Sequence, residues 1–239
     1  MSLAESLDIL FEDNHCIALN KPSGWPTTHF AGEDTVDRLV KSYLKEKYQK
    51  PGKVFLGVVH RLDKPVSGTL LFARTSKAAA RLSEQFREGA VEKTYWAVIS
   101  NAERGTRNAE LANAGTLEDW LVKDDKVRRV ATARNTKEAK HAFTHYQVRV
   151  AHGDLTLLEL RPQTGRKHQL RVQLASRGLP IVGDTKYGST QTFGNGIALH
   201  ARSLTFLHPV RGEPITLTAE VPPLWRGRFA YLLPRESPR

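Results

Sequence analysis

The sequence predicts an α+β fold, with a mainly antiparallel or mixed β-sheet and flanking helices. Segments with the composition of strands outnumber segments with the apolar spacing of helices. Several neighbouring strands are separated only by short turns, which join antiparallel strands and are too short for a parallel crossover. No repeat, low-complexity tract or linker rich in Pro, Gly and Ser divides the 239 residues. We therefore expect a single catalytic or binding domain over residues 1–239.

The N-terminal part begins with two strands and a helix. Residues 7–11 and 16–19 are apolar and flank the polar turn 12–15, as expected for two strands joined by a turn. Lys21-Pro22 ends the second strand, because proline cannot donate an amide proton to the sheet. Residues 35–48 carry apolar side chains at a spacing of three and four, which predicts a helix.

The remaining elements follow in alternation with turns. Residues 54–59 and 68–73 are short apolar strands with a charged turn between them. Thr75 or Ser76 caps a helix that ends at Gly89, a residue type common at helix C-termini. We further expect a helix at 167–177, and strands at 95–99, 144–150, 155–160, 199–207 and 215–220. The apolar pattern that predicts helices and strands is least clear over residues 101–140.

Charge points to the kind of partner. The chain has 36 Lys+Arg against 25 Asp+Glu, a formal net charge of +11. Such an excess favours a polyanionic partner, above all nucleic acid. A basic enzyme without such a partner is the alternative that charge alone leaves open.

The sequence also indicates the cellular compartment of the protein. No apolar run is long enough to span a bilayer, and the N-terminus lacks the basic and apolar regions of a signal peptide. The single Cys16 allows neither an intramolecular disulfide nor a Cys-rich zinc module. We therefore expect a cytoplasmic protein with no membrane partner, and we expect it to be a monomer.

Metal and nucleotide motifs are missing from the sequence. No HExxH pair occurs, and His141 and His145 precede a β-branched pattern that argues against a helical ligand pair. Gly194-Asn195-Gly196 lacks the third glycine and the helix of a dinucleotide-binding loop, and no Walker-type motif is present. We expect neither a metal nor a cofactor.

The first candidate site is the turn 60–65 between two apolar strands. Asp63 lies there among His60, Arg61 and Lys64, so we expect its carboxyl group to stay ionised. An ionised carboxylate suits nucleophilic or electrostatic work at a sugar carbon better than general acid catalysis. The structural alternative is a turn aspartate that caps backbone amides.

The second candidate is the basic segment 161–177, which has five Lys/Arg and no acidic residue. Cations in the first turn of a helix oppose its dipole unless an anion is near, such as a phosphate or the carboxylate of Asp63. Lys167 and Arg171 are four residues apart, so they share a helix face and are candidates for contacts with RNA phosphates. A solvated basic helix is the alternative.

Two further features suggest contact with RNA. Tyr95 and Trp96 are neighbours in a strand and face opposite sides, so they cannot both lie in one core. One ring is thus a candidate to stack on a base, although an exposed aromatic often only covers a sheet face. Arg128 and Arg129 lie in a basic stretch between Lys123 and Lys140, and we expect them to contact RNA.

Several of these residues together resemble the RluA family of pseudouridine synthases. The resemblance extends from about Leu7 to Trp225. Val66 and Lys167 are small departures from the usual pattern. The matching stretches, in order and spacing, are Leu19–Gly24, His60-Arg61-Leu62-Asp63 followed by Ser67–Ala73, Glu92–Tyr95, Thr164–Arg171, and Ala198–Pro209.

The resemblance implies the roles of the site residues. Asp63 is implied to be the catalytic carboxylate, either attacking C1′ of the ribose or removing a sugar proton. Tyr95 would stack on the uracil, and Arg166 would pair with Asp63. Leu170 would form an apolar floor below the base, and Arg61 would fill the space of the flipped uridine.

The implied protein is an isomerase with the pseudouridine synthase catalytic fold and no N-terminal S4 domain. It would convert a specific uridine of tRNA or rRNA to pseudouridine, by glycosidic bond cleavage, base rotation and reattachment at carbon 5, without cofactor or metal. A catalytically idle RNA-binding protein on the same scaffold is the alternative. A glycoside hydrolase ranks last, because it needs two carboxylates and the motifs supply only Asp63.

Overall fold

The computed structural model describes residues 7–28, 32, 34–101, 111–124, 129–134 and 136–234. The chain divides into two compact units, of which the first comprises residues 1–93 and 201–220, and the second residues 94–200 and 221–239. Strands predominate over helices in the described residues, which confirms the α+β prediction. That both units form a single catalytic domain stays a prediction.

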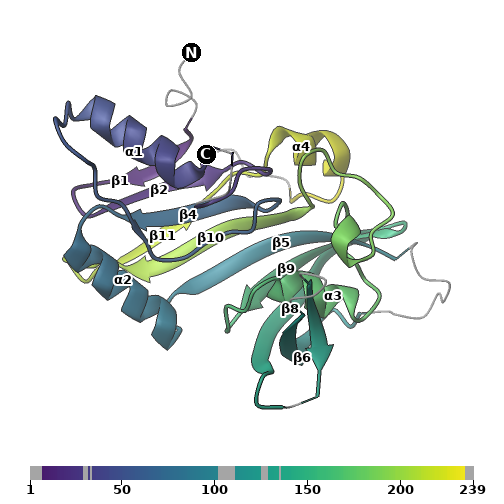
Figure 1. Cartoon of the computed structure of the whole chain (residues 1–239). Helices are drawn as coiled ribbons and strands as arrows, with labels where there is room; N and C mark the ends of the chain where they lie inside the picture. Colours follow the sequence, from purple (N-terminus) through teal and green to yellow (C-terminus); the bar gives the residue numbers. More distant parts are fainter. Residues whose placement is uncertain are drawn as a thin grey trace. The chain divides into compact units, whose positions relative to one another are not determined.

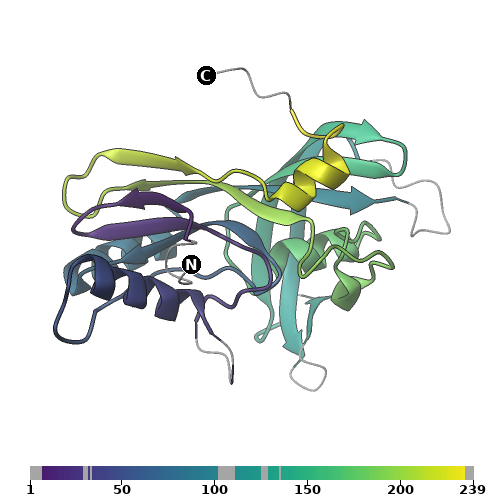
Figure 2. The ribbon, with the colours of Figure 1, turned by 90° about the horizontal axis from the view of Figure 1, so that it is seen from above.

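The first unit has strands in the order β1-β2-β4-β10, with β3 also paired to β4 and β11 to β10. The strand pairs β1–β2, β2–β4, β3–β4 and β10–β11 are all antiparallel. Figure 2 shows the hairpin of β10 and β11 from above. The bounds are β1 Ile9–Glu12, β2 Cys16–Lys21, α1 Val36–Lys47, β3 Gly57–Val58, β4 Ser67–Ala73, α2 Ser76–Glu88, β11 Pro214–Thr218 and β10 Leu199–Leu207, whose first two residues belong to the second unit.

The helices α1 and α2 pack on opposite faces of these strands (Figure 1). Ala78 and Leu82 of α2 belong to one core with Cys16 and Ala18 of β2. Glu12 is the cross-strand partner of Ile17, so it lies on the other face, because residues alternate along a strand. There it accepts a hydrogen bond of 2.8 Å from the Tyr43 hydroxyl of α1.

The ends of α2 agree with the sequence prediction. The Thr75 hydroxyl accepts a hydrogen bond of 3.2 Å from the amide of Ala78, which satisfies one of the free amides of the first turn. Gly89 takes the left-handed conformation at the C-terminus, with φ of 75°. Local side-chain chemistry therefore sets both ends of this helix.

The second unit has the strand order β5-β9-β8-β6-β7, again with antiparallel pairing. Figure 1 shows α3 beside these strands. Residues 114–124 and 129–133, which gave no clear pattern in the sequence, form β6 and β7. The bounds are β5 Glu92–Ser100, whose first two residues belong to the first unit, β6 Ala114–Asp124, β7 Arg129–Ala133, β8 Lys140–His152, β9 Leu155–Pro162, α3 Gln169–Ala175, the short 3₁₀ helix η2 Thr185–Tyr187 and α4 Pro223–Phe229.

The helix α3 is shorter than the predicted 167–177. His168 has a φ of 54°, a left-handed conformation that a right-handed helix cannot contain, so α3 starts only at Gln169. Arg166 and Lys167 consequently lie in the turn before the helix and do not belong to its first turn.

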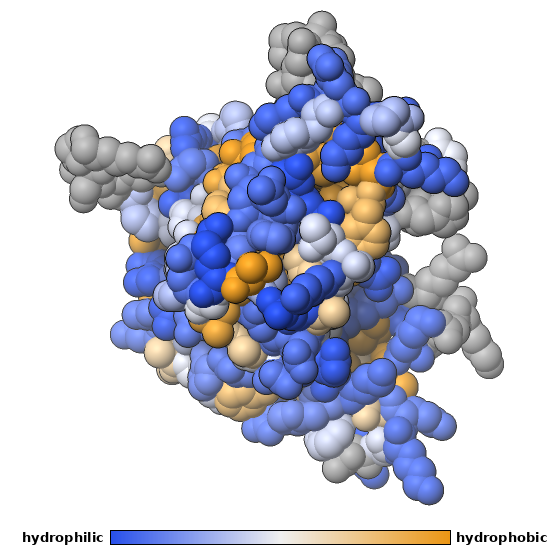
Figure 3. Space-filling model, turned by 90° about the vertical axis from the view of Figure 1, so that its left-hand side faces the viewer, coloured by the Kyte–Doolittle hydropathy of each residue, from blue (hydrophilic) through white to orange (hydrophobic). Residues whose placement is uncertain are grey.

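The surface carries few large apolar side chains. The face in Figure 3 is mostly hydrophilic, with small separate hydrophobic areas. Among the described residues no helix combines the length and the hydrophobicity needed to cross a bilayer. The exposed large hydrophobic residues are Tyr48, Phe55, Val58, Leu207, Val210, Leu224 and Tyr231.

Candidate active site

Asp63 lies on the loop between β3 and β4, and the backbone around it is tied to the segment that follows β2. The Thr27 hydroxyl donates to the carbonyl of Leu62 at 2.8 Å and accepts from the amide of the same residue at 3.2 Å. On the other side of Asp63, the carbonyl of Lys64 accepts from the amide of Gly24 at 2.8 Å. Bonds on both sides hold the half-buried Asp63 in place.

The side chain of Lys21 adds a third tie and is fully buried. Its Nζ donates to the carbonyls of Pro22 and Trp25, each at 2.9 Å, and to that of Lys64 at 3.3 Å. Burial lowers the pKa of Lys21 to about 7, and the carboxylate of Asp63 acts in the opposite direction. Lys21 is thus a buried amine that interacts electrostatically with Asp63.

In the sequence, Lys21 stood out only as part of a motif, and its burial beside the Asp63 loop was not predicted. A signal was present in the sequence, since Lys21 directly extends the apolar strand 16–19. A charged residue in a buried strand needs polar partners, and here backbone carbonyls supply them.

His60 does not supply the positive charge that the sequence suggested for it. Its Nε2 accepts a hydrogen bond of 2.9 Å from the amide of Leu71, and its ring stacks on Phe86 with 4.6 Å between centroids. Burial lowers the pKa of His60 to about 3, and the charge of Lys93 acts in the same direction. His60 is therefore a neutral structural residue, and Arg61 is exposed on the same loop.

Gly68 allows a close backbone contact beside this loop. Its φ is +115°, and a Cβ atom there would lie 2.3 Å from the carbonyl oxygen of Ala201. Gly68 is also the cross-strand partner of Lys21. A side chain at this position would push β4, which follows the Asp63 loop, away from β10.

In the second unit, Arg166 lies on a turn that Gln169 organises. The Gln169 Oε1 accepts from the Thr164 hydroxyl at 2.8 Å and from the amide of Arg166 at 3.0 Å. The Nε of Arg166 donates to the carbonyl of His141 at 2.9 Å. The turn and the guanidinium are thus both attached to β8, and Thr164 also accepts from the amide of Phe143 at 3.0 Å.

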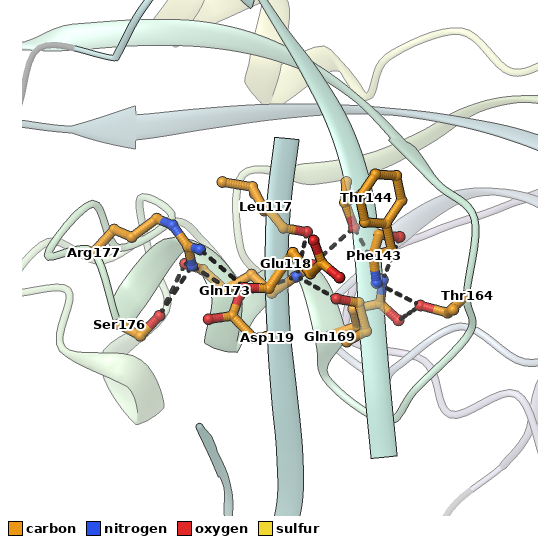
Figure 4. A network of polar contacts seen from close by, with 11 residues as sticks. Leu117, Glu118, Asp119, Phe143, Thr144, Thr164, Gln169, Gln173, Ser176 and Arg177 are labelled. Atoms are coloured by element: carbon orange, nitrogen blue, oxygen red, sulfur yellow. Dashed lines mark hydrogen bonds and ion pairs between the residues drawn. The ribbon is translucent and has the colours of Figure 1, made fainter. Parts of the chain in front are cut away.

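Buried amide side chains anchor α3 behind this turn (Figure 4). The Gln169 Nε2 donates to the Thr144 hydroxyl at 2.9 Å, and that hydroxyl donates to the Oε1 of Gln173 at 2.8 Å. The Gln173 Nε2 in turn donates to the carbonyl of Leu117 at 2.9 Å. Because all three polar side chains are buried, loss of one partner would leave the others unsatisfied.

Tyr95 lies on the face of the sheet that carries Thr144. It is the cross-strand partner of Leu160, which in turn pairs with Tyr146, and paired residues share a face. Tyr146 is two residues from Thr144, so both project to the side of α3. Tyr95 is half-buried, and Leu170 of α3 is buried. This placement is compatible with the implied stacking and floor roles, which stay predictions.

The other predicted RNA contacts fall into different environments. Lys167 and Arg129 are exposed, whereas Arg128 lies outside the described residues. Arg171 is only 4% exposed, and its guanidinium makes two bonds to Asp184, at 2.7 and 2.8 Å. Arg171 therefore forms a buried ion pair, and we do not retain it as a phosphate contact.

Asp63 belongs to the first unit, and Tyr95, Arg166 and Leu170 to the second. The structure thus describes how each of these residues is held within its own unit. The pairing of Arg166 with Asp63 stays a prediction.

In the described part of the chain, one cluster of possible metal ligands belongs to the first unit and is formed by Asp13, Cys16 and His208. The Nδ1 of His208 accepts from the amides of Val210 and Arg211, at 3.2 and 2.9 Å. Its Nε2 therefore carries the proton and donates to Asp13 at 2.7 Å. Burial raises the pKa of Cys16 to about 12, so the thiol stays protonated. These protonation states suit a structural hydrogen-bond cluster and not a set of metal ligands.

The described fold is similar to that of a solved human structure, RNA Pseudouridylate Synthase Domain Containing 4. The TM-score is 0.79 at 27% identity, over 96% of this chain and 95% of the other. Human RNA Pseudouridylate Synthase Domain Containing 1 matches with a TM-score of 0.68 at 24% identity, over 93% of this chain and 86% of the other. The fold is thus of the pseudouridylate synthase class.

Sequence comparisons agree. A family model described as RNA pseudouridylate synthase matches residues 15–176. The tRNA pseudouridine synthase C of Pectobacterium carotovorum subsp. carotovorum is 35% identical over 95% of this chain and 62% of the relative. The ribosomal large subunit pseudouridine synthase D of Xanthomonas campestris pv. campestris is 36% identical, over 90% and 66%. The tRNA pseudouridine synthase C of Yersinia pestis is 34% identical, over 92% and 89%.

The chain spans less than two thirds of the first two of these relatives and most of the third. It belongs to the RNA pseudouridylate synthase family, which confirms the resemblance drawn from the motifs.

Proposed function

We propose that this chain is an RNA pseudouridine synthase, an isomerase that acts on a uridine of tRNA or rRNA. Family membership supports the proposal, and one observation carries it to a residue. Asp63 of the family-like motif lies on a loop that is fixed by bonds to the amide of Gly24, to Thr27 and to Lys21. These hydrogen bonds hold the backbone on both sides of Asp63, and a carboxylate held in one position is suited to act on a substrate.

The reaction conserves all atoms. The bond between N1 of uracil and C1′ of ribose breaks, the base rotates, and C5 of uracil bonds to C1′. The proton on C5 is then lost, and N1 is protonated, so no net reactant is consumed. Asp63 either attacks C1′ or removes a sugar proton in the first step, and both routes need its ionised form.

The remaining residues bind and orient the substrate. Tyr95 stacks on the uracil ring and Leu170 supports it from an apolar side. Arg166 pairs with Asp63 and keeps it ionised. Arg61, exposed beside Asp63, occupies the space that the flipped uridine leaves. No residue in this scheme requires a metal or an organic cofactor.

The substrate class rests on the relatives. Two of those named above are tRNA pseudouridine synthases and one is a ribosomal large subunit pseudouridine synthase, at similar identities. We therefore propose structured tRNA or rRNA as the substrate, acted on by a cytoplasmic, monomeric enzyme. An idle RNA-binding protein on the same scaffold is the alternative, and Asp63 speaks against it, because binding of RNA phosphates alone does not need a fixed carboxylate.

The test is the release of tritium from RNA labelled at carbon 5 of uracil. The wild-type protein should release tritium from bulk tRNA or rRNA. Asp63→Asn should reduce the rate by at least about 1,000-fold, because both routes need the carboxylate. Asp154→Asn is the matched control, since Asp154 is exposed in the turn between β8 and β9. RNA binding by the wild type without any release would refute the proposal and favour the idle protein.

A further inference from the structure

The buried carboxylate of Glu159 in β9 holds two arginines of the second unit, Arg149 and Arg161, which we call the arginine pair. Glu159 is only 5% exposed. Its Oε2 accepts a hydrogen bond of 3.0 Å from Nε of Arg149 and a second bond from Nη2 of the same guanidinium. Its Oε1 lies 2.6 Å from Nη2 of Arg161. Because one carboxylate offsets only one of two positive charges, the arginine pair keeps a net positive charge.

The arginine pair reaches solvent with donors to spare. The side chain of Arg149 is 39% exposed and that of Arg161 is 60% exposed. Neither arginine forms an ion pair with a second acid among the residues that the structure describes. A guanidinium carries five N–H donors, of which Glu159 engages only a part. Two guanidiniums held by one buried carboxylate also lose less side-chain entropy when a ligand binds.

The arginine pair lies on the face of the sheet that is turned away from α3. Thr144 of β8 projects toward α3, to which it is hydrogen-bonded. The next residue, His145, therefore projects to the other face, and it is the cross-strand partner of Arg161. Gln147 lies on the same face, since it is two residues further along β8 and pairs with Glu159. The arginine pair, an imidazole and an amide thus share one surface.

A pocket of about 480 Å³ opens beside the arginine pair on this face. Its lining includes the short side chains of Ala114 and Thr116 in β6, which leave the room, and those of His145, Gln147 and Arg161. Pockets that hold small ligands have volumes of roughly 300–1,000 Å³. The pocket therefore has room for a planar ring next to a guanidinium.

His145 supplies a planar group at the pocket. It is exposed, and its ring packs edge-to-face with that of Phe143, with 4.9 Å between centroids and an angle of 88°. This geometry is favourable for ring pairs, so Phe143 supports the imidazole in one orientation. A ring at a pocket, with amide and guanidinium groups beside it, is how proteins bind an unpaired nucleobase.

We propose that the arginine pair and the pocket bind one unpaired nucleotide of the RNA substrate, with its phosphate on Arg149 and Arg161 and its base against His145. The identity of the RNA rests on the proposed function. Guanidinium groups match phosphate oxygens in charge and in the geometry of their hydrogen bonds. The base must be unpaired, because a paired base cannot present a face to a protein ring. Arg149 and His145 were not predicted as RNA contacts.

Glu159→Gln separates this subsite from a general effect of charge. The variant removes a negative charge from a basic protein, so general electrostatics predicts tighter binding of RNA. The subsite predicts weaker binding, because a neutral amide does not hold two guanidiniums in place. We expect the affinity for bulk tRNA, measured by filter retention at 0.1 M salt, to fall about fivefold.

The matched control is Glu118→Gln, which removes a carboxylate that is 61% exposed on the same face of the sheet. It should bind tRNA as the wild type does, or slightly more tightly. If Glu159→Gln bound tRNA as tightly as the wild type or as Glu118→Gln, the proposal would be overturned. Circular dichroism and urea unfolding show whether Glu159→Gln is folded, and an unfolded variant leaves the decision to the arginines.

The double variant Arg149→Gln, Arg161→Gln changes only side chains that reach solvent. Loss of one phosphate contact should reduce the slope of log affinity against log salt by about 1, which amounts to about tenfold weaker binding near 0.1 M salt. KM for tRNA in the tritium assay should rise by a similar factor. Lys45→Gln, Lys77→Gln removes the same charge from exposed positions of the first unit. An equal change of slope in this control, or an unchanged slope in the double variant, would overturn the proposal.

His145→Ala tests the base. Because stacking releases no counterions, affinity for tRNA should fall about fivefold while the salt slope stays that of the wild type. Wild-type affinity in this variant would refute the place of the base. A changed sedimentation coefficient of the arginine variant with unchanged RNA affinity would assign the face to a protein contact and overturn the proposal. If the wild-type protein binds tRNA but releases no tritium, the proposed function fails, while the binding measurements still decide the subsite.

Discussion

Replacing the buried Lys21 by Met should change how stability depends on pH. The folded protein lowers the pKa of Lys21 from 10.5 to about 7. Between these two values the unfolded chain binds the proton and the folded chain does not, so the free energy of unfolding rises with pH in this window. Below about pH 7 both states bind the proton, and the full cost of burying the ammonium is present.

The size of the effect follows from the width of the window. Each unit of pH contributes about 1.4 kcal/mol per proton, so the gain between pH 7 and pH 10 is up to about 4 kcal/mol. This value is an upper limit, because three carbonyl acceptors and the carboxylate of Asp63 favour the ammonium form. Lys21→Met keeps the length of the side chain and removes the titrating group.

The assay is urea unfolding followed by tryptophan fluorescence at pH 7, 8, 9 and 10. The difference in free energy of unfolding between wild type and Lys21→Met should shift in favour of the wild type as the pH rises. Groups that titrate in both proteins cancel in this difference. Lys45→Met, at an exposed position of α1, should follow the wild-type profile. Parallel profiles for the wild type and Lys21→Met would refute the argument.

Two other substitutions test the packing of each unit. Gly68→Ala should lower the free energy of unfolding by more than about 3 kcal/mol, since a Cβ would meet the Ala201 carbonyl at a φ of +115°; Gly227→Ala, where a Cβ meets nothing within 4 Å, is the control, and thermal unfolding measures both. Asp184→Asn should cost about 3–5 kcal/mol because it leaves the guanidinium of Arg171 buried without its counter-charge. Glu213→Gln, which breaks an exposed pair with Arg211, should stay below about 1 kcal/mol in the same urea assay. If Gly68→Ala and Gly227→Ala, or Asp184→Asn and Glu213→Gln, lowered the free energy of unfolding equally, the argument behind that pair would be contradicted.

Local signals predicted much of the fold. Thr75 and Gly89 mark the ends of α2 where the structure has them, because capping depends on neighbours within a few residues. The start of α3 was wrong by two residues, since the left-handed conformation of His168 accompanies its contact with Tyr187, 19 residues away. β6 and β7 were missed in a stretch without a clear apolar pattern.

For the candidate site, residue type and motif predicted Asp63, Tyr95 and Arg166, and their roles stay predictions. What the sequence did not show is which charged groups are buried. His60 is neutral and packed on Phe86, and Arg171 is paired with Asp184. Burial depends on the residues that surround a side chain in space, and these are not its neighbours in the chain.

The sequence by itself therefore determined the α+β class, the end points of elements with local caps, the family, and the excess of positive charge. The tertiary structure decided how that charge is divided. Lys21 bonds the carbonyl of Lys64, 43 residues away, and becomes part of the support for Asp63. Tyr187 accepts a hydrogen bond from the amide of Val130, 57 residues away, and thereby attaches η2 to β7. The free energy of a charge depends on solvation and on nearby partners, and only the folded chain sets both.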